Sequence, residues 1–162
     1  ETPQRYWRIG IRSPKHASRR KAAEERAAAI ARSPHGTDLR ALGNRTPPNE
    51  KPACILELSD CSVVTSSIYE RCFTDKCGNI HHHIVDPRTG RPSNSDLASA
   101  TVVSKRSIDG DGFSTALLIM GSYWAKNYAE GHPNLEAVLI TRNGQIEATS
   151  GIREAMGCRR PR

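Results

Sequence analysis

Two polar segments of the chain hold the residues best suited to chemistry. The first is Asp109-Gly110-Asp111-Gly112-Phe113-Ser114-Thr115. Asp111 and Thr115 stand four residues apart, and on a helix that spacing places both side chains on one face. A carboxylate and a hydroxyl both offer oxygen, the ligand atom that Mg²⁺ prefers. Asp111 also suits the start of a helix, where a carboxylate caps the chain and offsets the helix dipole, so both interpretations stay open.

The second segment is rich in histidine and ends in a turn: His81-His82-His83-Ile84-Val85-Asp86-Pro87-Arg88-Thr89-Gly90. On a strand, His81 and His83 share one face and His82 takes the other. Asp86 precedes a proline and therefore ends the strand, while Gly90 lets backbone approach a ligand. Three adjacent imidazoles also suit zinc, although neighbours on a strand diverge. An exposed histidine-rich turn and a ligand-facing strand end are the main alternatives.

A third segment follows an expected buried strand: Val63-Val64-Thr65-Ser66-Ser67-Ile68-Tyr69-Glu70-Arg71. Small hydroxyl side chains come after the apolar residues and before an aromatic ring. That pattern is typical both of the lining of a ligand pocket and of a simple turn, and spacing does not separate the two.

The elements that must position these segments are mostly strands. The expected strands cover residues 6–12, 53–58, 62–66, 80–85, 98–104, 135–141 and 146–149. In the first strand, alternation places Trp7, Ile9 and Ile11 toward the core. An Asn143-Gly144 pair predicts a hairpin between the last two strands. The fold class expected is α+β, with a mainly antiparallel sheet and one or two packed helices.

Two segments have the composition of helices. Residues 18–32 are rich in Ala, Arg and Glu and contain neither Gly nor Pro. A second helix is expected to begin near Asp109 to Asp111. It would bury a single apolar stripe of Phe113, Ala116, Leu117, Met120 and Trp124.

Residues 35–52 are rich in Gly, Pro and Asn, which is typical of a loop. We therefore expect an insertion that interrupts a single domain. The expected units are residues 1–14 (first strand), 15–52 (helical or disordered insertion), 53–152 (main part) and 153–162 (basic tail). The chain begins without Met and without a signal peptide, and we expect it to be a piece of a longer protein of unknown localisation.

The 162-residue chain carries 24 Lys and Arg against 17 Asp and Glu, a net charge of +7. A basic balance favours anionic partners, but no helix-turn-helix, zinc-finger or RNA-recognition motif accompanies it, so no nucleic acid is expected. No apolar run approaches the ~18 residues of a membrane span. The five cysteines are an odd number, so at least one is unpaired within the chain, and we expect them to be buried thiols.

Taken in chain order, the motifs resemble those of the ApbE family, the FAD:protein FMN transferases. The resemblance rests on Trp7-Arg8-Ile9-Gly10-Ile11, Thr65 to Arg71, His83 to Gly90, Asp111 to Leu117, Ala137 to Ile140 and Ser150-Gly151. It covers about residues 6–14 and 53–152 and matches the C-terminal part of that family. The family usually has Gly where this chain has Ser67.

The resemblance implies a Mg²⁺-dependent transfer of FMN from FAD to a Thr or Ser hydroxyl of an acceptor flavoprotein, with AMP leaving. It implies that Asp111 and Thr115 are the metal ligands and that His83 contacts the flavin diphosphate and acts as general base. The other residues implied at the FAD site are Thr65, Ser66 and Tyr69, with Asp86 and Arg88 in the turn beside it. Two alternatives stay open: hydrolysis of FAD to FMN and AMP, and a non-catalytic flavin-binding module of a larger flavoprotein. Bacterial members are often exported lipoproteins, which leaves the localisation of this chain unknown.

Overall fold

The computed structural model describes residues 6–14, 52–76 and 80–155. The described strands are β1 (Trp7–Ile11), β2 (Cys54–Leu58), β3 (Ser62–Ser67), β4 (Cys72–Thr74), β5 (Ile80–His82), β6 (Val85–Asp86), β7 (Arg91–Pro92), β8 (Leu97–Ser104), β9 (Leu135–Thr141) and β10 (Ile146–Ala148). The described helices are α2 (Ser107–Met120), α3 (Ser122–Gly131) and α4 (Ser150–Ala155). The expected helix at 18–32 and nearly all of the expected loop at 35–52 lie outside this part of the chain.

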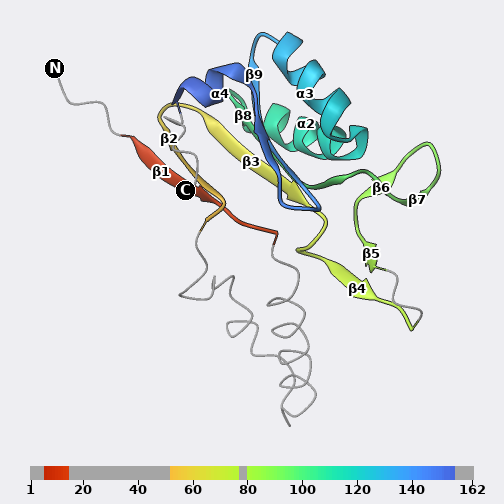
Figure 1. The fold of residues 1–162 in the computed structure, drawn as a ribbon. Coiled ribbons are helices and arrows are strands. Elements are labelled where there is room, and N and C mark those ends of the chain that lie inside the picture. Colours follow the sequence, from red (N-terminus) through yellow and green to blue (C-terminus); the bar gives the residue numbers. More distant parts are fainter. Residues whose placement is uncertain (1–5, 15–51, 77–79, 156–162) are drawn as a thin grey trace, which may run out of the picture.

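The principal sheet has the strand order β10-β9-β8-β3, and each neighbouring pair is antiparallel. Helices α2 and α3 cover one face of this sheet, and the antiparallel pair of β1 and β2 lies on the other side (Figure 1). Strands β4 and β5 form a separate hairpin that projects away from the sheet. The expected α+β class with a mainly antiparallel sheet is confirmed.

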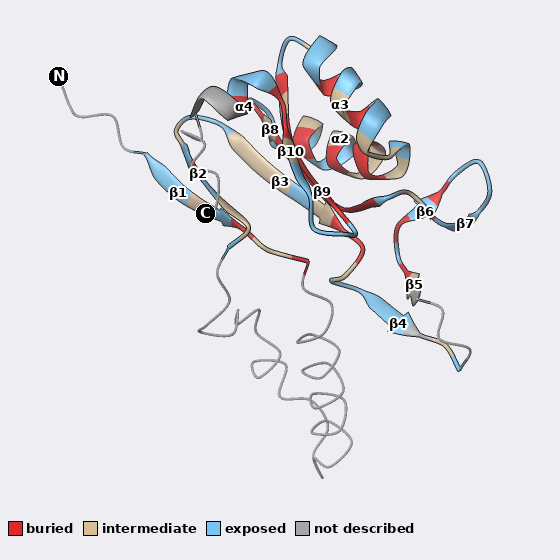
Figure 2. Cartoon of the chain, viewed as in Figure 1, coloured by how far each residue is buried: buried red, intermediate tan, exposed pale blue. Residues whose placement is uncertain are grey.

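Strand β9 is buried on both faces, which explains why its sequence is apolar without alternation. Ala137 and Leu139 pack into the cluster beneath α2 and α3. Val138 and Ile140 point to the opposite side, where they pack with Ile11 of β1 and with apolar residues of β2 and α4. Figure 2 shows the buried residues concentrated on β8, β9 and part of α2. The sheet is thus a rigid layer between two apolar clusters.

The helical region differs from the sequence prediction. Helix α2 ends at Met120 because Gly121 adopts a φ of 84°, and α3 begins at Ser122. The predicted stripe does not continue across this break. Its member Leu117 is buried as predicted, but Met120 and Trp124 are exposed. The other buried positions of α2 are Gly110, Ser114 and Leu118, which the prediction did not include.

Two strand predictions are also corrected. Trp7 is 71 % exposed, although Ile11 of the same strand is 3 % exposed. Trp7 lies at the far end of the β1–β2 pair from Ile11, opposite Leu58. The expected strand at 80–85 is divided into β5 and β6, so that His83 lies between two strands. His81 and His83 therefore do not share the face of one strand.

The structure also tests the predicted hairpin and the predicted state of the cysteines. The Asn143-Gly144 hairpin is confirmed, with Gly144 at a φ of 88° between β9 and β10. The expectation of buried cysteines is wrong for Cys61 and Cys72, which are exposed free thiols, whereas Cys54 is half-buried. Among the described residues, no helix has the length and apolar character needed to cross a bilayer.

Candidate functional site

One cavity of about 480 Å³ brings the three polar segments of the sequence together. Its lining residues come from the end of β3 and the loop after it, from the segment joining β5 to β6, and from α2. They are Thr65, Ser66, Ser67, Glu70, Arg71, His83, Ile84, Val85, Asp111 and Thr115. Of the residues named from the sequence, Thr65, Ser66, His83, Asp111 and Thr115 thus share one cavity, whereas Tyr69, Asp86 and Arg88 do not line it.

A glycine allows α2 to lie close to β3 at this cavity. A Cβ atom added at Gly110 would lie 2.8 Å from Cγ2 of Val64 and 3.2 Å from Oγ of Ser104. Val64 and Ser66 are two residues apart on a strand, and Gly110 and Ser114 are four apart on a helix. These steps span similar lengths, about 7 Å along the strand and 6 Å along the helix. Because Gly110 lies against Val64, Ser114 therefore lies beside Ser66.

The approach of helix and strand creates a cluster of hydroxyl groups at the cavity wall. Ser66 Oγ lies 2.8 Å from Ser114 Oγ and 2.9 Å from Thr115 Oγ1. Ser114 Oγ donates a hydrogen bond of 3.1 Å to the backbone oxygen of Asp111. On the other face of β3, Thr65 Oγ1 lies 2.8 Å from Oγ1 of Thr101. The cluster joins β3 to the part of α2 that contains Asp111 and Thr115, the proposed metal ligands.

Asp111 lies in the second turn of α2 and is not a capping residue. The N-cap position belongs to Arg106, and Asp109 is the acidic residue of the first turn. Asp109 pairs with Arg106 at 3.6 Å, whereas Asp111 is exposed and lines the cavity. The interpretation of Asp111 as a cap is therefore wrong, and its carboxylate remains available to a ligand.

The oxygen atoms at this wall fit a hard cation such as Mg²⁺. Asp111 offers a carboxylate and Thr115 a hydroxyl, and a Mg²⁺ site commonly combines one or two carboxylates with waters and substrate phosphates. Within the described residues, no group of three or more His, Cys, Asp or Glu side chains has the arrangement of a metal centre. A cation held by Asp111 and Thr115 would take its remaining ligands from waters and substrate phosphates.

The three histidines take separate partners and do not converge as zinc ligands would. His81 Nε2 lies 2.9 Å from Asp75 Oδ2, and His82 Nε2 lies 3.1 Å from the Ser93 oxygen. His83 is exposed at the cavity and places Nδ1 3.3 Å from the backbone oxygen of Arg71. A carbonyl oxygen only accepts, so Nδ1 of neutral His83 carries the proton and Nε2 is free to receive one.

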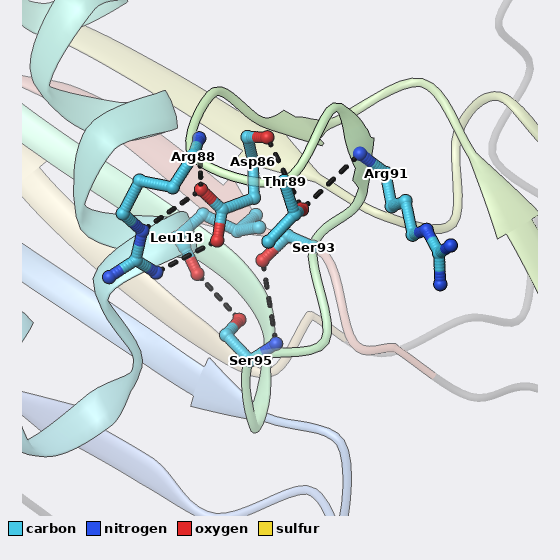
Figure 3. A network of polar contacts seen from close by, with 7 residues as sticks. All are labelled: Asp86, Arg88, Thr89, Arg91, Ser93, Ser95 and Leu118. Atoms are coloured by element: carbon cyan, nitrogen blue, oxygen red, sulfur yellow. Dashed lines mark hydrogen bonds and ion pairs between the residues drawn. The ribbon is translucent and has the colours of Figure 1, made fainter.

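The turn after His83 is stabilised by local hydrogen bonds (Figure 3). Asp86 accepts from the backbone nitrogen, Nε and Nη2 of Arg88 at 2.9, 3.0 and 2.8 Å. These bonds to Arg88 hold the pKa of the Asp86 carboxyl below its usual range. The backbone nitrogens of Thr89 and Gly90 both donate to the backbone oxygen of Asp86. Gly90 has a positive φ of 66°, which closes the turn. Asp86 and Arg88 therefore shape the turn rather than line the cavity.

His82 anchors this turn region to the body of the protein. Its side chain is 8 % exposed, and Nδ1 has no hydrogen-bond partner. Burial lowers the pKa of His82, with the positive charge of Arg142 acting in the same direction. Arg142 Nη2 also donates to the Ser93 oxygen, at 3.2 Å. Neutral His82 thus ties β5 to the segment that precedes β8.

Tyr69 has a structural position. Its hydroxyl donates to the backbone oxygen of Arg12 at 3.4 Å, and its ring packs against the cluster beneath the helices. It joins the end of β1 to the segment after β3.

Sequence reasoning missed several residues at and behind this wall. Ser114 lies four residues after Gly110 and so on the same helix face, but its contact with Ser66 depends on the packing of α2 on β3. Glu70 and Arg71 were inside a segment that spacing left open between pocket and turn. Ser67 is buried in β3 and has no positive φ, so a serine at this position carries no backbone strain.

Comparison with known proteins decides the family. The ApbE family profile matches residues 1–139. The chain belongs to the ApbE family. The FAD:protein FMN transferase of Treponema pallidum (strain Nichols) is 36 % identical over 121 residues, which is 75 % of this chain and 30 % of that protein. The enzyme of the same name from Klebsiella pneumoniae (strain 342) is 38 % identical over 95 residues, 59 % of this chain and 30 % of that protein.

Solved structures give the same result for the fold of this ApbE-family chain. The ApbE protein of Thermotoga maritima matches with a TM-score of 0.65 at 21 % identity, covering 96 % of this chain and 40 % of that one. The apo flavinyl transferase ApbE of Pseudomonas stutzeri matches with a TM-score of 0.61 at 25 % identity, covering 96 % and 38 %. The chain thus spans well under half the length of the ApbE proteins that it matches.

Proposed function

We propose that the full-length gene product containing this chain transfers FMN from FAD to a Ser or Thr hydroxyl of an acceptor flavoprotein. The observation that carries the proposal is the shared cavity, in which Asp111 and Thr115 of α2 face the same space as His83. The relatives in Treponema and Klebsiella are named FAD:protein FMN transferases, which supports transfer of FMN from FAD to a protein.

In this reaction the acceptor hydroxyl oxygen forms a bond to the FMN phosphorus, and the bond from that phosphorus to the bridging oxygen breaks. AMP leaves with the bridging oxygen. Asp111 and Thr115 would hold Mg²⁺, which when bound withdraws charge from the pyrophosphate and favours departure of AMP.

The chain's own residues account for the remaining needs of the reaction. Nε2 of His83 takes the proton of the attacking hydroxyl, because Nδ1 donates to the Arg71 oxygen and leaves the lone pair of Nε2 for a proton. The Arg71 guanidinium adds a positive charge at the cavity for the phosphates. The Asp86–Arg88 turn holds the chain that follows His83 in one conformation.

The test is covalent labelling of an acceptor protein by the full-length gene product, scored by in-gel flavin fluorescence. We expect Asp111→Ala to abolish labelling and His83→Ala to lower its rate by about 10²–10⁴-fold, the usual contribution of a general base. Asp109→Ala is the matched control, because it removes a carboxylate from the same helix outside the cavity. Wild-type labelling by Asp111→Ala would refute the site.

The same assay separates the two alternatives. Release of free FMN and AMP without labelled protein, lost in Asp111→Ala, would indicate FAD hydrolysis with water as the acceptor. Binding of FAD without turnover would indicate a flavin-binding module.

A further inference from the structure

The hydroxyl cluster between β3 and α2 has one feature that the proposed reaction leaves unused, the direction of its hydrogen bonds. A hydroxyl group carries one proton and two lone pairs, whereas a carbonyl oxygen only accepts. Three contacts join Thr115, Ser66, Ser114 and the backbone oxygen of Asp111. We call this row of hydrogen bonds the relay. Because the carbonyl at one end of the relay can only accept, it determines which oxygen atom donates in each of the other contacts.

Ser114 Oγ must donate to the Asp111 oxygen, 3.1 Å away. Its single proton is then engaged, so in the 2.8 Å contact Ser66 donates to Ser114. Ser66 has no second proton, so in the 2.9 Å contact Thr115 donates to Ser66. The proton of Thr115 is thereby directed at β3, and both lone pairs of its Oγ1 are left without a proton from this relay.

We propose that Ser66 and Ser114 are positioning residues that turn the Thr115 hydroxyl so that its lone pairs face a cation in the cavity. The proposal rests on the proposed function, since it concerns the same Mg²⁺ site. A hydroxyl free to rotate has to give up its alternative orientations before it ligates a metal. The relay removes that cost by orienting the ligand before the cation arrives.

Burial makes the relay rigid. Ser114 is fully buried, and Ser66 and Thr115 are half-buried. In such surroundings an unmade hydrogen bond costs about 1–3 kcal/mol, so the three hydroxyls keep their partners. Gly110 allows these short distances, because a Cβ at this position would lie 2.8 Å from Cγ2 of Val64 and push α2 away from β3.

The relay also assigns different roles to two adjacent residues of the helix. Thr115 ligates, and Ser114 fixes the proton of Ser66 and through it the proton of Thr115. Without the Ser114 hydroxyl, the Ser66 proton can turn to Thr115, and the Thr115 proton then points away from β3. Loss of Ser114 is therefore expected to weaken metal binding although Ser114 does not line the cavity.

The experiment measures binding of Mn²⁺, a paramagnetic substitute for Mg²⁺, to the full-length gene product by EPR titration in the presence of FAD. We expect Ser114→Ala and Ser66→Ala to weaken Mn²⁺ binding by about 10–100-fold, the usual effect of losing a group that orients a ligand. Ser66→Thr retains the hydroxyl that Ser66→Ala removes, and we expect it to bind Mn²⁺ with wild-type affinity. Flavin transfer by Ser114→Ala is expected to recover at saturating metal.

Ser95→Ala is the matched control. Ser95 Oγ also donates to a backbone oxygen of α2, that of Leu118, but lies outside the relay (Figure 3). It is expected to lower the melting temperature without changing Mn²⁺ affinity. If Ser114→Ala is too unstable to assay, the Ser66→Ala and Ser66→Thr pair carries the test.

The possible failures are distinguishable. If Asp111→Ala loses Mn²⁺ while Ser66→Ala and Ser114→Ala bind it as wild type does, the relay is refuted and the metal site stands. If Asp111→Ala also binds Mn²⁺ with unchanged affinity, the metal site of the proposed function is refuted together with the relay.

Discussion

The two motifs beside the cavity are positioned by different kinds of contact. The helix motif at residues 109–115 is held by bonds between residues far apart in sequence, such as Ser66 and Ser114, which are 48 positions apart. The turn at residues 86–90, which follows His83, is held by bonds within itself, such as those between Asp86 and Arg88, two positions apart. The helix motif therefore depends on the packed sheet, and the turn motif depends on its own sequence.

This difference has a consequence for mutations. A substitution on β3 or at the inner face of α2 is expected to disturb the proposed metal ligands without touching them. A substitution inside the turn is expected to disturb only the neighbourhood of His83.

The largest expected effect comes from Gly110→Ala. The added Cβ meets Val64 at 2.8 Å, and Val64 cannot turn aside freely because it is β-branched. We expect a loss of about 1–3 kcal/mol in the free energy of unfolding and a loss of Mn²⁺ affinity, measured by urea denaturation and EPR.

Gly112→Ala is the control for this prediction. It lies two residues further along α2, and a Cβ there meets nothing within 4 Å. Since Ala favours helix more than Gly does, we expect it to stabilise the protein by about 0.5–1 kcal/mol. Equal effects of the two substitutions would show that close packing of α2 on β3 does not position the site.

A smaller effect is expected for Asp86→Ala. This change removes the acceptor of three bonds from Arg88 and so loosens the turn after His83. We expect flavin transfer to fall by up to about 10²-fold, the effect of a 1 Å misplacement, with Mn²⁺ affinity unchanged. Arg91→Ala removes a charge from the same turn, and its side chain points away from the network (Figure 3), so it should leave both quantities unaltered. A parallel loss of Mn²⁺ affinity in Asp86→Ala would contradict the separation of the two motifs.

The smallest expected effect is a pH dependence at His82. Because burial lowers the pKa of His82 in the folded protein, the unfolded chain binds the proton more readily. The stability contributed by neutral His82 is therefore complete above about pH 6.5, the ordinary pKa of histidine, and is lost as pH falls through the folded-state pKa. Nearby Arg142 and His83 act in the same direction.

The measurement is the melting temperature of wild type and His82→Gln across this pH range. Gln retains an N–H that can donate to the Ser93 oxygen but does not titrate. We expect wild type to lose more stability than His82→Gln as pH falls. Identical pH profiles would exclude His82 as the group responsible.

Much of the fold was predictable because its signals are local. The apolar run of β9 and the Asn143-Gly144 turn identified a strand and a hairpin from neighbouring residues alone. The break between α2 and α3 was missed because a single glycine, Gly121, interrupts a sequence that otherwise continues as helix. Trp7 was misplaced because alternation indicates a face but not whether another layer covers it.

The site was predictable as a set of segments but not as a wall of bonded hydroxyls. Asp111 and Thr115 were identified by their spacing, and His83 was singled out through the family motif. The role of Ser114 was not visible, because it depends on a contact with Ser66 that exists only when α2 lies on β3. The division of the histidine run was missed for the same reason, since the partners of His82 and His83 come from other segments.

The central claim is that Asp111 and Thr115 hold the cation that assists transfer of FMN. Its most direct test is the anomalous scattering of Mn²⁺ in crystals of the full-length gene product soaked with FAD. The account predicts a peak within bonding distance of an Asp111 carboxylate oxygen and Thr115 Oγ1, beside the FAD diphosphate. A peak at the diphosphate that leaves both side chains without contact to the metal would contradict it.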